Sequence, residues 1–190
     1  MTPSASASPT SSSPTSASPS REPEPKWDRR NKFYSSDKSL YTSDWYEGRG
    51  RIMINFGCTE APYYDPSPKC SGGQGFHHGT DVALPCGTAL HSAVKGTVTD
   101  PGRAGTPGPS YGSKAFRIHD QQRGVDILIA HASKVFVSPG DTVAVGDRIA
   151  LAGAEGAPDG CHLHLEVRPA RGGVSSAVDP ADVLDLTEAR

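Results

Sequence analysis

Residues 161–167 read CHLHLEV, and this stretch decides the fold class. In an extended chain, successive side chains point to opposite faces. One face of this stretch would carry three apolar side chains, Leu163, Leu165 and Val167. The other face would carry His162, His164 and Glu166. An apolar face toward a core with two imidazoles opposite predicts a β-strand that carries a site on the open side of a sheet.

Short apolar runs rich in β-branched residues continue this pattern along the chain. We expect further strands at residues 52–56, 80–84, 90–98, 114–119, 125–130 and 148–152. Turn signals that contain Gly and Pro separate these runs. A long apolar stripe at helical period is missing, and only residues 180–186 suggest a helical turn or two. The sequence therefore predicts a mainly β fold.

The first part of the chain has a different composition. Residues 2–20 contain only Ser, Thr, Pro and Ala, which cannot bury enough apolar surface to offset chain entropy. The charged, Pro-containing run that follows, residues 21–32, continues as a linker. We expect a disordered tail and linker over residues 1–42 and one folded domain over residues 43–190, a length sufficient for a proper core.

Net charge and cysteine usage limit the partners and the compartment. The formal net charge of −2 argues against a nucleic acid or an anionic membrane as a partner. No stretch of the sequence approaches the ~20 apolar residues that a membrane span needs. The four cysteines lack C-x-x-C spacing, which favours two disulfides, Cys58–Cys70 and Cys86–Cys161, over a structural zinc site. Because Ser/Pro-rich tethers often follow a signal peptide or a lipid anchor, we expect a secreted or cell-envelope monomer.

A second motif precedes the strand that ends near residue 84. Residues 75–81 read GFHHGTD, and in an extended segment His77 and Asp81 point to the same face, with Gly79 leaving room between them. If His164 meets these two residues, a metal ion gains three protein ligands. A catalytic zinc keeps its fourth position for water, and bound zinc lowers the pKa of that water toward neutrality.

Zinc-dependent hydrolysis also needs a group that takes a proton. The sequence lacks the H-E-x-x-H motif, so we assign this role to His162, on the same face as His164, and to His131, which ends the run 125–130. Glu166 could orient a ligand or form a surface salt bridge, and Asp126 is interpreted as a turn or edge residue. The remaining histidines are interpreted as non-ligands, namely His78, His91 and His119.

Three motifs in this order carry a family resemblance. H-x-G-x-D at residues 77–81, A-H-x-S at 130–133 and G-C-H-L-H-x-E-V at 160–167 resemble the lysostaphin and LytM-type zinc endopeptidases, a likeness that spans residues 52–183. The resemblance implies an antiparallel β-sheet that forms a groove with the metal on its floor. It also implies a substrate, the stem or cross-bridge peptides of bacterial peptidoglycan.

The resemblance assigns a role to each matching residue. His77, Asp81 and His164 would bind one zinc ion, while His131 and His162 would flank the metal-bound water. The alternative is a catalytically silent module of the same fold that binds or activates wall components. Such relatives lack ligands, whereas all five positions are filled here. A third interpretation, a zinc site used only for stability, would need a fourth protein ligand.

Overall fold

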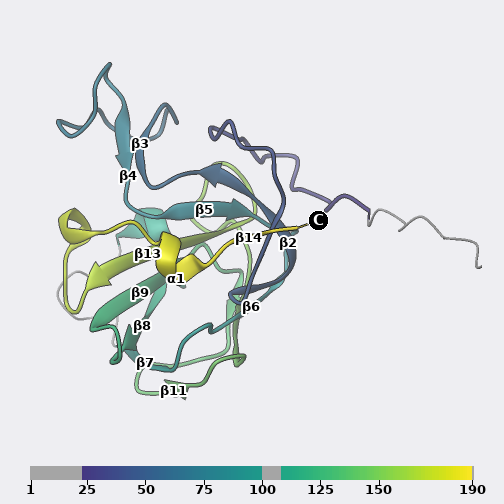
Figure 1. Cartoon of the computed structure of the whole chain (residues 1–190), viewed down its shortest axis with the longest axis vertical. Coiled ribbons are helices and arrows are strands. Elements are labelled where there is room, and N and C mark those ends of the chain that lie inside the picture. The colour runs from purple at the N-terminus through teal and green to yellow at the C-terminus, as the bar shows by residue number, and fades with distance from the viewer. Residues whose placement is uncertain (1–22, 100–107, 190) are drawn as a thin grey trace, which may run out of the picture.

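One large antiparallel sheet makes up most of the molecule (Figure 1). The computed structural model describes residues 23–99 and 108–189. Within these ranges the 12-stranded sheet has the order β10-β12-β6-β2-β5-β13-β9-β8-β7-β11, with β1 beside β2 and β14 beside β1. A separate hairpin, β3–β4, projects from one end of the molecule, as Figure 1 shows at the top. The expectation of a mainly β, antiparallel fold is confirmed.

The strands and helices have the following bounds. The strands are β1 Tyr41–Ser43, β2 Tyr46–Ile54, β3 Gly57–Thr59, β4 Gly75–His77, β5 Thr80–Ala83, β6 Ala89–His91, β7 Gly96–Thr99, β8 Phe116–Asp120, β9 Val125–Ala130, β10 Lys134–Val135, β11 Thr142–Val143, β12 Arg148–Leu151, β13 His162–Pro169 and β14 Thr187–Glu188. The helical elements are short, namely η1 Pro109–Tyr111, η2 Val174–Ser176 and α1 Ala181–Leu184.

The strand expected over residues 90–98 is instead two strands, β6 and β7, joined by a turn. The buried hydroxyl of Ser92 donates to the carbonyl of Val94 at 2.7 Å and accepts from the Val94 N–H at 3.4 Å. A Ser side chain that bonds its own neighbourhood in this way competes with the sheet ladder. The turn therefore forms without Gly or Pro, which is why the sequence pattern runs through it.

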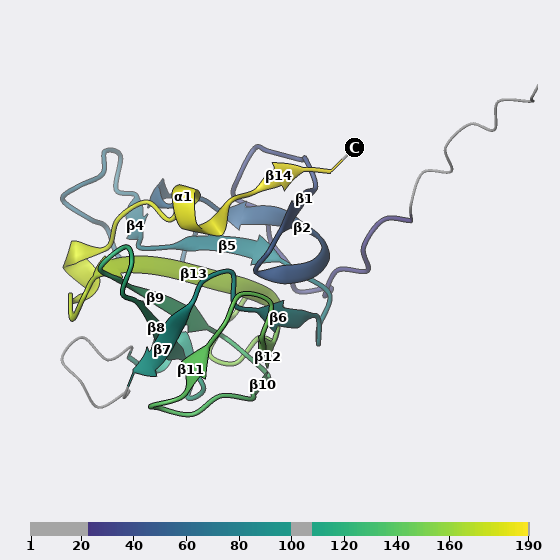
Figure 2. The ribbon, with the colours of Figure 1, turned by 60° about the horizontal axis from the view of Figure 1, so that its bottom comes forward.

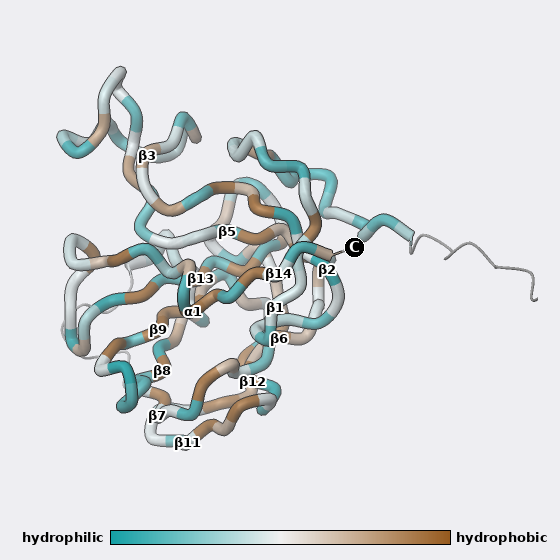
Figure 3. The backbone as a smooth tube through the Cα atoms, viewed as in Figure 1, coloured by the Kyte–Doolittle hydropathy of each residue, from teal (hydrophilic) through white to brown (hydrophobic). Residues whose placement is uncertain are grey.

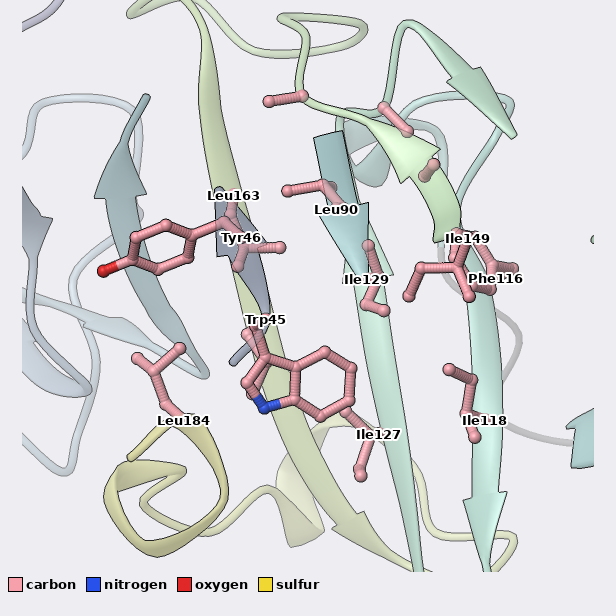
Figure 4. Packing of buried hydrophobic residues seen from close by; sticks show 14 of the residues in the cluster. Trp45, Tyr46, Leu90, Phe116, Ile118, Ile127, Ile129, Ile149, Leu163 and Leu184 are labelled. Atoms are coloured by element: carbon pink, nitrogen blue, oxygen red, sulfur yellow. The ribbon is translucent and has the colours of Figure 1, made fainter. Parts of the chain in front are cut away.

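The main core lies against the apolar face of β13, as Figure 4 shows. Leu163 and Leu165 are fully buried there, together with Ile127 and Ile129 of the neighbouring β9. Trp45 packs on the same cluster and donates its indole N–H to the carbonyl of Val183 at 2.7 Å, which attaches α1 to the sheet. The hydropathy colouring of Figure 3 shows brown segments along these central strands. The opposite face of β13 is thereby left for polar residues.

Residues 27–42, part of the predicted linker, lie against the domain in Figures 1 and 2. Trp27, Phe33 and Tyr34 pack on a second buried cluster that contains Met53. The backbone N–H groups of Tyr34 and Ser35 both donate to the Met53 carbonyl, at 2.8 and 2.9 Å. The aromatic side chains of this charged segment thus pack on the domain, although the composition of the segment predicted a linker. The predicted disorder of residues 2–20 lies outside the described residues.

Both expected disulfides, Cys58–Cys70 and Cys86–Cys161, are present. The first ties the segment between β3 and β4, and the second joins the end of β5 to the start of β13. None of the helices in the described ranges has the length and apolar character that a bilayer crossing requires.

Candidate metal centre

The register of the central strands brings the polar motifs together. His164 on β13 lies opposite Asp81 on β5 and, on its other side, opposite Ala130 on β9. Directly opposed residues point to the same face of a sheet. Asp81 and His164 are therefore neighbours on the face away from the core, and His131 follows directly after Ala130. His77 ends β4, and two residues separate it from the start of β5.

Three side-chain atoms converge at this point. His164 Nδ1 lies 2.8 Å from Asp81 Oδ1 and 3.1 Å from His77 Nε2, and His77 Nε2 lies 3.3 Å from Asp81 Oδ1. All three residues are buried. Gly79 makes room for this arrangement, because a Cβ atom at that position would lie 2.8 and 2.9 Å from His164 ring atoms.

These spacings fit a divalent cation. Zinc ligands at about 2.0–2.1 Å in tetrahedral geometry lie about 3.3–3.4 Å from one another. The three separations here are 2.8, 3.1 and 3.3 Å, so the ligand atoms need to move apart by about half an ångström at most to hold the ion. Two imidazole nitrogens and one carboxylate oxygen can all act as acceptors toward the same point. Acceptors that face one another in a buried site need a proton or a cation between them. The group His77, Asp81 and His164 could therefore hold a metal ion.

The remote nitrogens of the two candidate ligands are held by acceptors. His77 Nδ1 lies 3.1 Å from the carbonyl oxygen of Asn55, which can only accept a hydrogen bond. His164 Nε2 lies 3.4 Å from Glu166 Oε2. A proton on each remote nitrogen leaves a lone pair on the nitrogen that faces the centre. Such partners are the usual means by which a protein orients metal-binding imidazoles.

His131 and His162 lie beside this centre with their rings 4.6 Å apart. His162 Nδ1 is 2.9 Å from the Gly160 carbonyl and His131 Nδ1 is 2.8 Å from the Glu155 carbonyl, so in the neutral rings these bonds place the proton on Nδ1 and the lone pair on Nε2. His162 Nε2 is buried without a hydrogen-bond partner among residues 23–99 and 108–189, and lies 3.7 Å from Asp81 Oδ1. The structure brings all five predicted site residues together.

The backbone of His131 adopts a positive φ of 59°, which is rare for a residue other than Gly. Its N–H donates to the carbonyl of Tyr111 at 3.0 Å, and its own carbonyl accepts from the Glu155 N–H at 3.3 Å. Together with the side-chain bond to Glu155, these contacts hold the strained conformation. Strain of this kind persists only where the surroundings over-determine it, and here it ends β9 with the imidazole at the groove.

Burial and mutual charge set the protonation of the site. Burial together with the neighbouring His162 and His164 lowers the pKa of His131 to about 3, so this imidazole is neutral. Burial disfavours the charged form of His164, but the Asp81 and Glu166 carboxylates outweigh it and raise the pKa of His164 to about 9. Burial likewise opposes ionisation of Asp81, yet the surrounding imidazoles hold its pKa well below the usual range.

Glu166 is fully buried, so the surface salt bridge considered for it is wrong, and its contact with His164 is the one that the ligand-orienting interpretation requires. Its carboxylate accepts from Arg168 Nε at 2.5 Å and from the Tyr111 hydroxyl at 2.9 Å, besides its contact with His164. Asp126, expected at a turn or edge, is also buried, because it lies on the polar face of the central strand β9. It pairs with Arg117 at 3.5 Å and with His119 at 2.8 Å.

The centre opens into a groove of about 460 Å³. Its walls are lined by Tyr64, His77, His78, Gly108, Ser110, Tyr111, His131, His164, Arg168 and Val174. The sequence pattern did not identify Tyr64 as part of the site. Tyr64 comes from the segment closed by the Cys58–Cys70 disulfide, and its ring centroid lies 5.4 Å from that of His77. A Tyr in a loop between turns has no periodic signal that would reveal such a position.

Comparison with known proteins assigns the family. The model of peptidase family M23 matches residues 75–180, more than half of the chain, and this range contains all five site residues. The chain belongs to peptidase family M23. The chain is also 36% identical over 91 residues to the peptidoglycan DD-endopeptidase ShyB of Vibrio cholerae, an alignment that covers 48% of this chain and 20% of that protein. This M23 chain thus spans about a fifth of that relative.

Solved structures show the same fold. The catalytic domain of the antimicrobial peptidase lysostaphin from Staphylococcus simulans aligns with a TM-score of 0.55 and 23% identity, over 72% of this chain and 92% of that one. A zinc-containing peptidase from Vibrio cholerae aligns with a TM-score of 0.51 and 27% identity, over 82% of this chain and 39% of that one. The M23 assignment and the sheet architecture therefore agree.

Proposed function

We propose that this M23 domain is a zinc-dependent endopeptidase that hydrolyses peptide bonds in bacterial peptidoglycan. The observation that carries the proposal is the convergence of three buried acceptor atoms, from His77, Asp81 and His164, beside two further imidazoles at the floor of an open groove. The name of the relative ShyB supports the substrate. The proposed site is one ion held by these three residues.

The donor set favours zinc. Two neutral imidazole nitrogens and one carboxylate oxygen are borderline ligands of the kind zinc prefers, whereas magnesium and calcium prefer oxygen alone. Three protein ligands instead of four leave a position for water or substrate, as catalytic zinc sites do. The zinc-containing peptidase among the structural relatives adds support. When bound, the ion would act as a Lewis acid and supply hydroxide near neutral pH.

His131 and His162 would move and hold protons beside the reacting peptide. The lone pair on His162 Nε2 has no partner in the described part of the chain, so it is available to accept a proton from an attacking water. Because His131 is neutral with Nδ1–H bonded to Glu155, its Nε2 also accepts, and once protonated it can stabilise negative charge on a carbonyl oxygen.

We further propose that residues 43–190 form the catalytic unit, with residues 1–42 as a tail whose last part packs on it. The two disulfides fit a site of action outside the cytoplasm. The described walls of the groove carry few charged side chains, which suits an extended peptide of a cross-linked polymer. We expect the domain to act as a monomer.

The test is mass analysis of peptidoglycan fragments after incubation with zinc-loaded protein, with a chelator-treated sample as control. New peptide ends that vanish with the chelator support the proposal, and their masses identify the bond. Binding to peptidoglycan without new ends from several wall types would overturn it in favour of the silent binding or activator module.

A further inference from the structure

The loop that precedes β13 orients His162. The imidazole Nδ1–H of His162 donates to the carbonyl oxygen of Gly160 at 2.9 Å. Since His162 Nε2 has no hydrogen-bond partner in the described residues, this bond is the hydrogen bond that sets the direction of the ring toward the metal centre, while Asp159 Oδ1 lies farther away, 3.9 Å from the same Nδ1. The position of the Gly160 carbonyl therefore decides where His162 points.

Asn31, in the N-terminal arm formed by residues 23–40, holds this loop from the other side. Its side-chain Nδ2 donates to the carbonyl oxygens of Asp159 at 3.0 Å and of Cys161 at 3.1 Å, the two carbonyls that flank Gly160. Carbonyls can only accept, so the orientation of the amide is fixed. With both neighbours anchored on the arm, the peptide plane of Gly160 is fixed with its oxygen toward His162.

The chemistry of Asn31 shows that it serves as a donor. Both N–H groups of the amide are used, whereas its Oδ1 is buried without a partner among residues 23–99 and 108–189. Leaving the buried Oδ1 unpaired costs free energy, so the stabilising role of the side chain lies in its two N–H groups. The arm also touches the loop closely, because a Cβ on Gly160, whose φ is +90°, would lie 2.9 Å from Asn31 Nδ2 and 3.1 Å from Asp28 Cγ.

We propose that Asn31 is a positioning residue for His162 and that the N-terminal arm, which lies outside the family match of residues 75–180, belongs to the working site. This inference rests on the proposed function of His162 as a proton acceptor. The Asp28 carboxylate of the arm also bonds the Cys161 backbone. The proposed route runs through Asn31, which fixes two carbonyls; these fix the Gly160 carbonyl, and that oxygen fixes the imidazole.

Two substitutions in the full-length zinc-loaded protein separate this role from simple packing. Asn31→Asp keeps the shape of the side chain but turns a carboxylate toward two carbonyl oxygens, so it repels the loop. Asn31→Ala leaves space in which water can donate to the same carbonyls. We expect Asn31→Asp to lower kcat on peptidoglycan by about 10–100-fold and Asn31→Ala to lower it less, with KM and zinc stoichiometry unchanged in both.

A second measurement does not depend on activity. Long-range 1H–15N correlation of the imidazoles, with His162 assigned from a His162→Gln variant, reports the tautomer. We expect the Nδ1–H tautomer in the wild type and mixed nitrogen shifts in Asn31→Asp. If wild-type protein cleaves no peptidoglycan, the proposed function fails, yet these spectra still test Asn31. An unchanged His162 tautomer in Asn31→Asp, or equal kcat losses in Asp and Ala variants, would overturn the positioning role.

Asp37→Asn is the matched control. It reverses the same exchange within the arm, at a carboxylate that accepts from the Tyr41 hydroxyl at 2.6 Å and the Ser39 N–H at 2.8 Å, away from the loop. We expect this variant to keep wild-type kcat and the wild-type His162 tautomer even if its melting temperature falls. Loss of kcat in Asp37→Asn as large as in Asn31→Asp would assign the effect to general loosening of the arm and contradict the proposal.

Discussion

Gly79→Ala should weaken metal binding without altering any ligand. Gly79 lies between His77 and Asp81, beside β13. A Cβ atom added there would lie 2.6 Å from the Leu165 carbonyl oxygen, 2.8 Å from His164 Cε1 and 2.9 Å from His164 Nε2. To reach an ordinary contact of 3.4 Å, atoms must separate by 0.5–0.8 Å.

The structure indicates which atoms move. Leu165 is paired with Thr80 on β5 and with Ile129 on β9, so its backbone is held between two strands of the central sheet. The imidazole of His164 is then displaced, together with its contact to Glu166. Disturbing the support of a metal ligand typically costs 10–100-fold in affinity, which corresponds to about 1.4–2.7 kcal/mol. Overpacking adds about 1–3 kcal/mol of lost folding stability.

Zinc affinity is measured by competition with a chromophoric chelator, and folding stability by denaturant unfolding of the metal-free proteins. The control is Gly173→Ala, since a Cβ at Gly173 meets nothing within 4 Å and its φ is −81°. We expect wild-type zinc affinity in this control. Wild-type zinc affinity in Gly79→Ala would refute the assignment of His164 as a ligand held against Gly79.

The structure also gives expected outcomes for the site histidines, for the two disulfides and for the pH dependence of zinc binding. His164→Ala should lose both zinc and activity, whereas His131→Ala should retain zinc and lose activity; turnover by zinc-loaded His131→Ala protein would eliminate the role of that residue. Removing the Cys86–Cys161 disulfide, whose sequence separation is 75, should lower the free energy of unfolding by about 4–5 kcal/mol. Removing Cys58–Cys70, with a separation of 12, should lower it by about 3 kcal/mol. Chemical denaturation measures both losses, and equal losses would contradict this order. The neighbouring carboxylates outweigh burial and raise the pKa of His164 to about 9, so the metal-free protein carries this proton at pH 7. Zinc uptake should release the proton, and the apparent zinc affinity should therefore rise with pH up to about 9. Calorimetry in buffers of different ionisation enthalpy measures the release, and binding heats that do not depend on the buffer would contradict it.

Alternation of residue types placed β5, β9 and β13 of the site, whereas β4, which carries His77, was not among the expected strands. The expected strand 125–130 coincides with β9, and the expected strand 162–167 lies within β13. Period-two patterning reports which face is buried, and this alone put His162 and His164 on one face. The sequence spacing also predicted that His77 and Asp81 share a face, because three intervening residues in an extended segment keep both side chains on one side.

The alternation of residue types does not predict contacts between segments that are far apart in the sequence. Asn31 came from a segment assigned to the linker, and nothing in its neighbourhood signals two carbonyls more than a hundred residues away. Asp126 was misassigned because its partners, Arg117 and His119, come from another strand. A buried charge is tolerated only where partners exist, and partners across a sheet depend on register. Tyr64 joins the groove through a loop whose path follows from a disulfide and not from periodicity.

The most direct test of the account is anomalous scattering at the zinc edge from crystals of the zinc-loaded protein. We expect one ion within about 2.0–2.2 Å of His77 Nε2, a carboxylate oxygen of Asp81 and His164 Nδ1, with the remaining position open toward His131 and His162. An ion closed off by a fourth protein ligand such as His162, or an ion bound elsewhere on the chain, would contradict the account.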